Sequence, residues 1–183
     1  MKGRLSNLRI TSGKYKNKRL LSVPGKSFRP MSERVKESLF SIIRSEIQDA
    51  FLLEFFAGTG NVSFEALSRG AARARLVEKS SVSIGLIKDN AELLGVKENI
   101  EVIHSDVFDY SENVSPDIFF AGPPYGENLS ATILVHAREK KILTPDTLVI
   151  IQHHKKDLPG SIGYERIDYR EYGITALSFF RLL

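Results

Sequence analysis

A buried strand that runs directly into a glycine-rich turn constrains this chain more than any other feature of its sequence. Residues 51–56 form a nearly continuous apolar run, which is typical of a strand buried on both faces of a sheet. The segment 56–60, Phe-Ala-Gly-Thr-Gly, follows at once, and a helix is predicted from about 62 to 69. Glycines allow backbone to approach a ligand closely because no Cβ intervenes. The three elements predict an α/β fold whose ligand binds at the carboxyl end of this strand.

The rest of the chain continues the alternation of strand and helix. Strands are predicted at about 75–78, 100–104, 117–121 and 147–152, and helices at about 82–94 and 129–140. This pattern predicts a mostly parallel sheet with helices on both faces.

The two ends of the chain depart from this alternation. Strands at about 164–169 and 175–181 leave no room for a helix between them, so they predict an antiparallel hairpin at one sheet edge. Near the start, residues 8–24 predict a β-hairpin, with strands at 8–11 and 19–23. Ser32 is expected to cap a helix that runs to about Glu46.

The length and composition bound the kind of protein. A chain of 183 residues fits one domain, which we expect to span 1–183, with a basic hairpin extension at 1–30 and a core at 31–183. There is no cysteine, and no apolar run approaches the ~20 residues of a membrane helix. The polar, charged N-terminus lacks the apolar segment of a signal peptide. We therefore expect a cytoplasmic monomer without a membrane partner.

Positive charge is concentrated at the start of the chain. Residues 1–44 hold twelve Lys and Arg against two acids, a net charge of +10 in a chain whose total is +4. A basic arm on an acidic body favours a polyanionic partner, usually nucleic acid, and the alternative is a solvated segment that keeps the protein soluble. Five of these cations are crowded together: Arg9, Lys14, Lys16, Lys18 and Arg19.

Three acids lie at or beside the ends of the first three core strands: Glu54, Glu78 and Asp106. A phosphate at the start of the helix after the glycines would meet the Glu54 carboxylate, with no Lys or Arg before Arg69 to compensate. Glu54 suits an ammonium or sulfonium group, and Glu78 stands where an acid binds ribose hydroxyls. Three interpretations stay open here: S-adenosylmethionine, a dinucleotide whose third glycine is missing, and a purely structural turn.

The segment Gly122-Pro123-Pro124-Tyr125 follows the predicted fourth core strand. Prolines donate no backbone hydrogen bond, and Tyr125 offers a face on which a flipped base could stack. The alternative is a rigid loop with a packed tyrosine. The histidines form no ligand cluster in the sequence, so no metal is expected.

Six segments together carry a resemblance that covers nearly the whole chain: 9–16, 29–30, 34–40, 56–60, 65–71 and 172–179. They are similar to the small-subunit ribosomal RNA guanine-N2 methyltransferases of the RsmD type. Segments 65–71 and 172–179 are the specific signals, whereas the glycine turn is shared by adenosylmethionine enzymes in general.

The resemblance implies a Rossmann-like methyltransferase fold with a seven-stranded sheet and an N-terminal β-hairpin. It implies ribosomal RNA as substrate, within a small-subunit assembly particle, with S-adenosylmethionine as cofactor and S-adenosylhomocysteine as product. Glu54 replaces the usual Asp and should face the methionine end, Glu78 should hold the ribose and Asp106 the adenine amino group. The implied cofactor residues are Glu54, Phe56, Ala57, Gly58, Gly60, Glu78, Lys79, Asp106 and Val107. The implied RNA-binding residues are Arg9, Lys14, Lys16, Lys18, Arg19, Arg29 and Arg34.

The implied catalytic residues are Gly122, Pro123, Pro124 and Tyr125. They correspond to the motif Asp/Asn-Pro-Pro-Tyr/Phe of methyltransferases that act on exocyclic amines. Acceptors on the amine hydrogens orient the nitrogen and favour the pyramidal form that attacks the methyl group.

This chain departs from the motif at its first position, where Gly122 offers no side-chain acceptor. A hydrogen bond to a charged group contributes about 1.5–3 kcal/mol, so its loss slows transfer roughly 10–150-fold. Three explanations stay open. In the first, the Pro123 carbonyl and a water act as the acceptors in a weakened enzyme. In the second, the chain is a catalytically silent relative that still binds cofactor and RNA. In the third, another acid such as Glu127 takes the place of the missing side chain.

Overall fold

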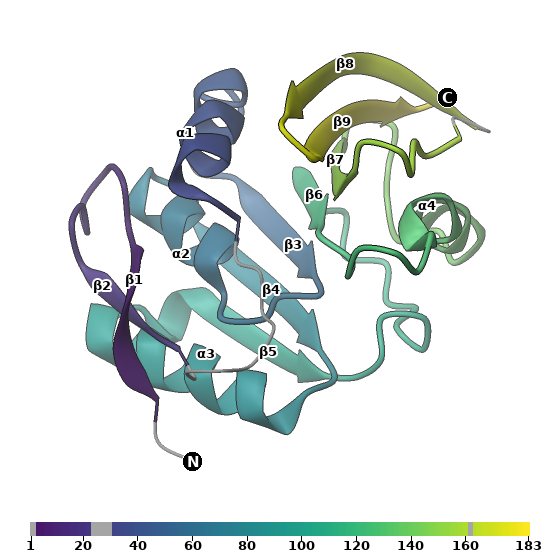
Figure 1. Ribbon diagram of the computed structural model, residues 1–183. Coiled ribbons are helices and arrows are strands. Elements are labelled where there is room, and N and C mark those ends of the chain that lie inside the picture. Colours follow the sequence, from purple (N-terminus) through teal and green to yellow (C-terminus); the bar gives the residue numbers. More distant parts are fainter. Residues whose placement is uncertain (1–2, 23–30, 161–162) are drawn as a thin grey trace.

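The computed structural model describes residues 3–22, 31–160 and 163–183, and a twisted seven-stranded sheet forms its centre (Figure 1). The strands are ordered β5-β4-β3-β6-β7-β9-β8. The first five are parallel, whereas β9 runs antiparallel to both β7 and β8. The predicted mostly parallel sheet with an antiparallel edge hairpin is thus confirmed. The strands are β3 Phe51–Phe55, β4 Arg73–Glu78, β5 Ile100–His104, β6 Ile118–Ala121, β7 Leu148–His154, β8 Tyr164–Tyr172 and β9 Thr175–Leu182.

Strand β3 lies between β4 and β6, and all five of its residues are buried. Successive side chains point to opposite faces, so Leu52 packs into one hydrophobic core and Leu53 into the other. This explains why the sequence of the strand is a continuous apolar run rather than an alternating one.

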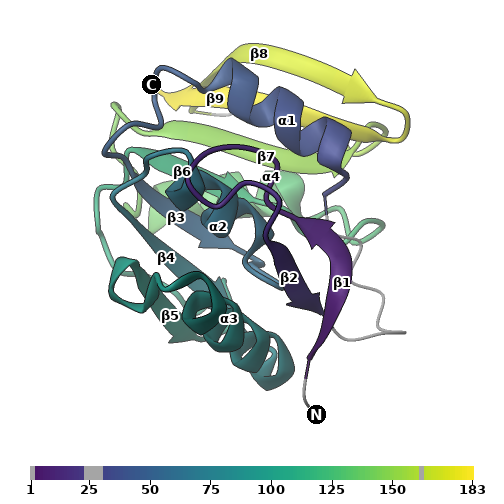
Figure 2. The same cartoon turned by 90° about the vertical axis from the view of Figure 1, so that its left-hand side faces the viewer.

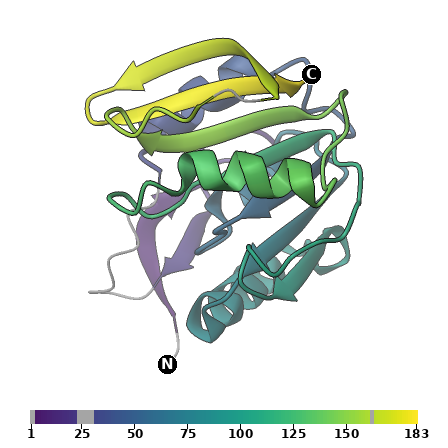
Figure 3. The ribbon, with the colours of Figure 1, turned by 90° about the vertical axis from the view of Figure 1, so that its right-hand side faces the viewer.

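Helices cover both faces of the sheet. Helices α1 (Glu33–Ile42), α2 (Asn61–Ser68) and α3 (Ser81–Leu94) lie on one face (Figure 2). Helix α4 (Leu129–Glu139) covers the other face (Figure 3), and a short 3-10 helix, η1, spans Lys97–Asn99. Among the described residues, no helix is long and apolar enough to cross a membrane.

The helix caps follow the sequence signals. The Ser32 hydroxyl accepts a hydrogen bond from the Val35 N–H, and Gly95 ends α3 in the left-handed conformation. Helix α1 ends at Ile42 rather than near Glu46. The chain turns there, and Ile47 packs into the core ahead of β3, so tertiary packing overrides the local helical preference.

The N-terminal hairpin is a two-stranded antiparallel sheet of β1 (Arg4–Arg9) and β2 (Arg19–Ser22). Strand β1 begins earlier than predicted, because Arg4 and Leu5 pair with Ser22 and Leu21. The Ser6 hydroxyl donates to the Leu20 carbonyl at 2.9 Å where the ladder is irregular. The predicted continuation of the second strand into residues 23–24 lies outside the described residues. Ile10 and Leu20 are fully buried and belong to the hydrophobic cluster that also contains residues of α1, α2 and α3, so the hairpin is part of the packed structure.

A buried ion pair fastens the hairpin to the helices. The Lys36 Nζ of α1 lies 3.0 Å from the Glu65 Oε2 of α2, and neither side chain is exposed. Lys36 also donates to the Arg9 carbonyl at 2.6 Å. The Glu65 carboxylate accepts from the Thr11 N–H at 2.9 Å, and Arg69 Nε approaches it to 2.7 Å. One carboxylate therefore connects α1, α2 and the loop that follows β1.

The loop between β1 and β2 rests on the carboxyl end of α2. The Lys14 N–H donates to the Ser68 carbonyl at 2.8 Å, and the Tyr15 N–H donates to the Ser68 hydroxyl at 2.9 Å. A Cβ at Gly13 would lie 1.8 Å from that same carbonyl, and its φ of +83° also favours glycine. On the other side, Asn90 of α3 bonds the Leu21 backbone.

Candidate active site

A pocket of about 620 Å³ opens at the carboxyl ends of β3, β4, β6 and β7, where ligands bind in open α/β sheets. It brings together residues from the glycine turn, from the acids and from the proline-tyrosine segment. It is lined by Met31, Glu54, Phe56, Ala57, Gly58, Thr59, Asn61, Val62, Glu78, Phe120, Gly122, Pro123, Pro124, Tyr125 and Gln152.

The glycine turn is built from left-handed backbone. Phe56, Gly58 and Gly60 have φ values of +57°, +57° and +75°, and the Gly60 N–H bonds the Ala57 carbonyl at 2.8 Å. Gly60 does not line the pocket, although we predicted it to bind the ligand. A Cβ at Gly60 would lie 2.6 Å from the ring of Phe64 and 3.3 Å from the side chain of Leu76, so this glycine lets the first turn of α2 pack against β4.

Glu54 lies on β3 beneath the turn and is almost completely buried. Its Oε2 accepts hydrogen bonds from the N–H and the hydroxyl of Ser63, on α2. Burial raises the pKa of Glu54 to about 7, and the charge of Glu78 adds to this rise, while the Ser63 hydrogen bonds oppose it. The pocket therefore holds a carboxyl group that a ligand cation would ionise.

Asn61, the first residue of α2, carries a buried donor without a partner. Its Oδ1 accepts from Lys36 Nζ at 2.8 Å, which fixes the orientation of the amide. Its Nδ2 bonds no atom of the described residues, although Asn61 is only 5% exposed and lines the pocket. An unpaired buried donor is costly, so the site favours a ligand that brings an acceptor here.

Glu78 supports the turn from the end of β4. Its Oε2 accepts from the Gly58 N–H at 2.9 Å and its Oε1 from the Ser80 N–H at 2.8 Å. A carboxylate has about four lone-pair sites, so these two bonds leave acceptor capacity for a ligand hydroxyl. Glu78 therefore holds the glycine turn in shape and still lines the pocket.

The proline-tyrosine segment forms the opposite wall. The Tyr125 hydroxyl lies 2.8 Å from the Thr175 Oγ1 and accepts from Gln152 Nε2 at 3.2 Å. These two bonds hold the Tyr125 ring just beyond the carboxyl end of β6. Glu127, the acid considered as a substitute for the missing motif side chain, is exposed and does not line the pocket.

Besides Gly60, three other predicted cofactor residues lie outside the lining. Lys79 and Asp106 form an exposed ion pair at 3.3 Å, and the Phe108 N–H lowers the pKa of Asp106. Val107 is buried in the core on the α4 side. Their part in cofactor binding stays a prediction.

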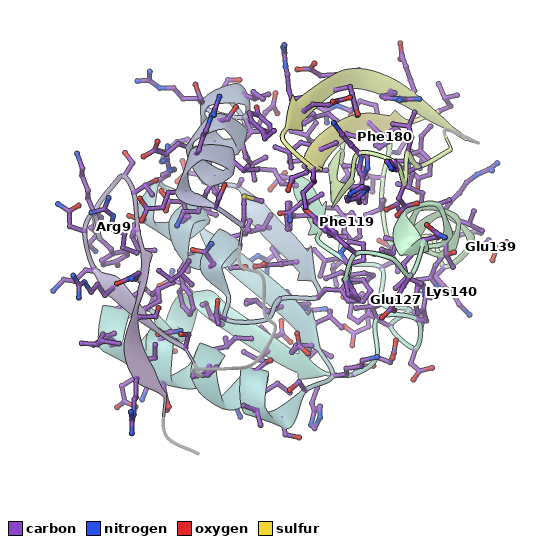
Figure 4. All side chains as sticks on the ribbon, in the orientation of Figure 1. Arg9, Phe119, Glu127, Glu139, Lys140 and Phe180 are labelled. Atoms are coloured by element: carbon purple, nitrogen blue, oxygen red, sulfur yellow. The ribbon has the colours of Figure 1, made fainter. Side chains whose placement is uncertain are left out.

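The predicted RNA-binding residues are spread over the hairpin and α1. Lys14, Lys16, Lys18 and Arg19 are exposed, and so is Arg34. Arg9 is exposed but already forms a two-bond pair with Glu33, with both N–O distances 3.0 Å. Figure 4 shows Arg9 on the opposite side of the molecule from Lys140. Arg29 lies outside the described residues.

Six lining residues were missed by the sequence analysis: Met31, Thr59, Asn61, Val62, Phe120 and Gln152. Asn61 directly follows the glycine turn, so its position in the sequence could have pointed to it. Gln152 ends the predicted strand 147–152 and reaches the site through the pairing of β7 with β6. In the described parts of the chain, no three His, Asp or Glu side chains gather as a metal site would require.

Comparison with known proteins shows the family to which the chain belongs. The family described as "Conserved hypothetical protein 95" matches residues 8–181. The chain belongs to that family. It is 31% identical over 182 residues to Ribosomal RNA small subunit methyltransferase D of Escherichia coli, with 90% of each chain covered. It is 28% identical over 181 residues to YlbH of Bacillus subtilis, covering 95% of this chain and 98% of that one. The resemblance to RsmD-type enzymes is thereby confirmed.

Solved structures agree with the fold of this family member. The yhhF protein of Escherichia coli has a TM-score of 0.83 and 26% identity, with 95% of this chain and 97% of that chain covered. An RNA methyltransferase from Salinibacter ruber, solved with S-adenosyl-L-homocysteine, has a TM-score of 0.68 at 15% identity over 84% of this chain and 93% of that one. The Rossmann-like methyltransferase fold is confirmed.

Proposed function

We propose that this protein transfers a methyl group from S-adenosylmethionine to the exocyclic N2 amine of a guanine in small-subunit ribosomal RNA. The observation that carries the proposal is one pocket walled by Glu54 and Asn61 on one side and by the Pro-Pro-Tyr segment on the other. The names of its relatives support ribosomal RNA as the substrate class. We further propose that residues 1–183 act as a single domain, as a cytoplasmic monomer, on an assembly particle of the small subunit.

The pocket residues fit the chemical groups of this cofactor. Glu54 would face the ammonium group, and the free Nδ2 of Asn61 would donate to the carboxylate of the methionine end. Glu78 would accept from the ribose hydroxyls with the lone pairs that Gly58 and Ser80 leave free. The backbone of residues 56–58 closes this side of the pocket.

The opposite wall would hold the base. Tyr125 offers a ring held by two hydrogen bonds, and the prolines leave carbonyls free to accept from the amine. When bound, the cofactor supplies a methyl group: the N2–C bond forms as the C–S bond breaks, its electron pair stays on sulfur, and one N2 proton leaves. The residues of the chain contribute mainly by positioning the amine.

The basic loop at Lys14–Arg19 would bind RNA phosphates. It rests on the carboxyl end of α2, whose first residue, Asn61, lines the pocket. An eight-residue helix is about 12 Å long, so the loop lies near the site where a base would be held.

Neutralising this loop should weaken RNA binding. The variant Lys16→Gln/Lys18→Gln is expected to bind small-subunit RNA several-fold more weakly. The slope of the logarithm of the binding constant against the logarithm of the salt concentration should become shallower by about 1.4. The matched control Lys140→Gln/Lys141→Gln removes two exposed cations at the end of α4. Filter binding at several salt concentrations measures the RNA affinity and the salt slope of both variants. Equal effects of the two variants would contradict the placement of RNA on the loop.

The missing acceptor at Gly122 provides the test of the reaction. A Cβ there would lie 3.4 Å from the Phe120 ring, an ordinary contact, so an aspartate fits the backbone. Gly122→Asp is expected to raise the rate of labelled methyl incorporation roughly 10–150-fold, with Gly122→Ala as the control without an acceptor. The substrate is small-subunit RNA or its assembly particle.

The outcomes separate two functions. A second candidate, a silent relative that binds cofactor and RNA, is favoured by one observation: position 122 carries no side chain. Incorporation by Gly122→Asp but none by the wild type would assign the silent role to this chain. No incorporation by either protein would contradict the proposed reaction.

A further inference from the structure

We propose that Gln152 supplies the hydrogen-bond acceptor that Gly122 lacks. The proposal rests on the proposed function and deepens it, because it assigns the positioning of the substrate amine to a residue on a different strand. Gln152 stands outside the proline-tyrosine segment, at the carboxyl end of the neighbouring strand β7.

The sheet places Gln152 beside the missing side chain. Strands β6 and β7 are parallel with Ala121 opposite Ile151, so Gly122 and Gln152 are the next residues along the two strands. A Cβ built on Gly122 would lie 4.0 Å from the Cβ of Gln152. Both residues line the pocket. The Gln152 side chain thus borders the space that an aspartate at position 122 would occupy.

The amide of Gln152 is oriented by its neighbours. Its Nε2 donates to the Tyr125 hydroxyl at 3.2 Å, and that hydroxyl is itself held by the Thr175 Oγ1 at 2.8 Å. The Oε1 accepts no hydrogen bond from the residues that the structure describes. Because Tyr125 engages the nitrogen of the amide, the oxygen is left as the acceptor for a ligand.

An amide oxygen performs part of the role of a carboxylate. It accepts a hydrogen bond from one N2–H of guanine, which orients the nitrogen lone pair toward the methyl donor. An amide is not a base at neutral pH, so the N2 proton that leaves goes to water rather than to Gln152. The site is therefore expected to be slower than one with an aspartate but to retain positioned transfer.

The experiment measures single-turnover methyl transfer with enzyme in excess over small-subunit RNA, alongside S-adenosylmethionine affinity by calorimetry. Gln152→Met keeps the length of the side chain and removes the acceptor, and it is expected to slow transfer roughly tenfold with cofactor affinity unchanged. Gln152→Met should slow transfer much less in the Gly122→Asp background than in the wild type, because the aspartate then supplies the acceptor.

The control Thr175→Val loosens Tyr125 without removing the acceptor. Any loss that it causes should be the same factor in the wild type and in the Gly122→Asp background. Full activity of Gln152→Met, or an equal loss in the wild-type and Gly122→Asp backgrounds, would overturn the role of Gln152 while leaving the proposed function intact. If neither the wild type nor Gly122→Asp transfers a methyl group, both the function and this role are wrong.

Discussion

Replacing Lys36 by methionine is expected to lower the free energy of unfolding by about 3 kcal/mol, because it removes the fully buried cation that faces Glu65 and leaves only the partly exposed Arg69 beside that carboxylate. Burial lowers the pKa of Lys36, and the charge of Glu65 opposes this change in part. Burial also opposes ionisation of Glu65, but Lys36, the Thr11 N–H and Arg69 outweigh it and hold the pKa of Glu65 below its usual value. The pair is therefore charged on both sides. Urea unfolding at neutral pH measures the effect.

A surface ion pair provides the matched control. Lys97 lies 3.1 Å from Glu92, with both side chains more than half exposed, so Lys97→Met should change stability by less than about 1 kcal/mol. The variant Lys36→Met/Glu65→Leu should lose less than the sum of its two single variants, since neither charge is then left alone. Additive losses, or equal losses for Lys36→Met and Lys97→Met, would show that the buried pair is not coupled.

The second large effect is the pH dependence that Glu54 gives to stability. Its pKa is about 7 in the folded protein against an ordinary value of 4.5, so the folded state keeps a proton that the unfolded state releases. The stabilisation from this carboxyl group is complete below about pH 4.5 and is lost as the pH rises through 7. The loss amounts to about 3 kcal/mol. The variant Glu54→Gln keeps an acceptor for Ser63, and its stability should lack this pH-dependent contribution.

Thermal unfolding of wild type and Glu54→Gln between pH 5 and 8 measures the difference, because other titrating groups are common to both proteins. Cofactor binding should show the opposite trend. An ammonium group binds the ionised form of Glu54, so S-adenosylmethionine affinity is expected to fall about tenfold from pH 8 to pH 6 in the wild type and to stay level in Glu54→Gln. A difference between the two proteins that does not change with pH would contradict the raised pKa.

The parts of the fold that the sequence predicted are those with local causes. Ser32 and Gly95 bound their helices through hydrogen bonds and backbone conformations confined to a few residues. The glycine turn has its cause in the residues that form it, and the edge hairpin of β8 and β9 follows from a connection too short for a helix. Each of these was predicted correctly, within a few residues at the boundaries.

The parts that escaped prediction depend on contacts between distant segments. Lys36 counted as one more cation of a basic arm, and its burial is set by Glu65, which lies 29 residues later in the chain. Arg9 likewise is paired with Glu33 rather than free. Gln152 enters the site only because β7 pairs with β6 in a particular register. Local patterns hold no information about such partners.

The docking of the hairpin means that the basic arm is not a portable module. Cutting the chain after Ser22 would uncover Glu65 and Ser68 and would remove the apolar cover that Ile10 and Leu20 provide. It would also free Asn90, which bonds the Leu21 backbone and the Thr59 carbonyl in the glycine turn. If a truncated protein failed to bind RNA, the cause could be damage to the pocket beside the glycine turn as much as the missing arm. Grafting the arm onto another scaffold would require the outer face of α2 to be transplanted with it.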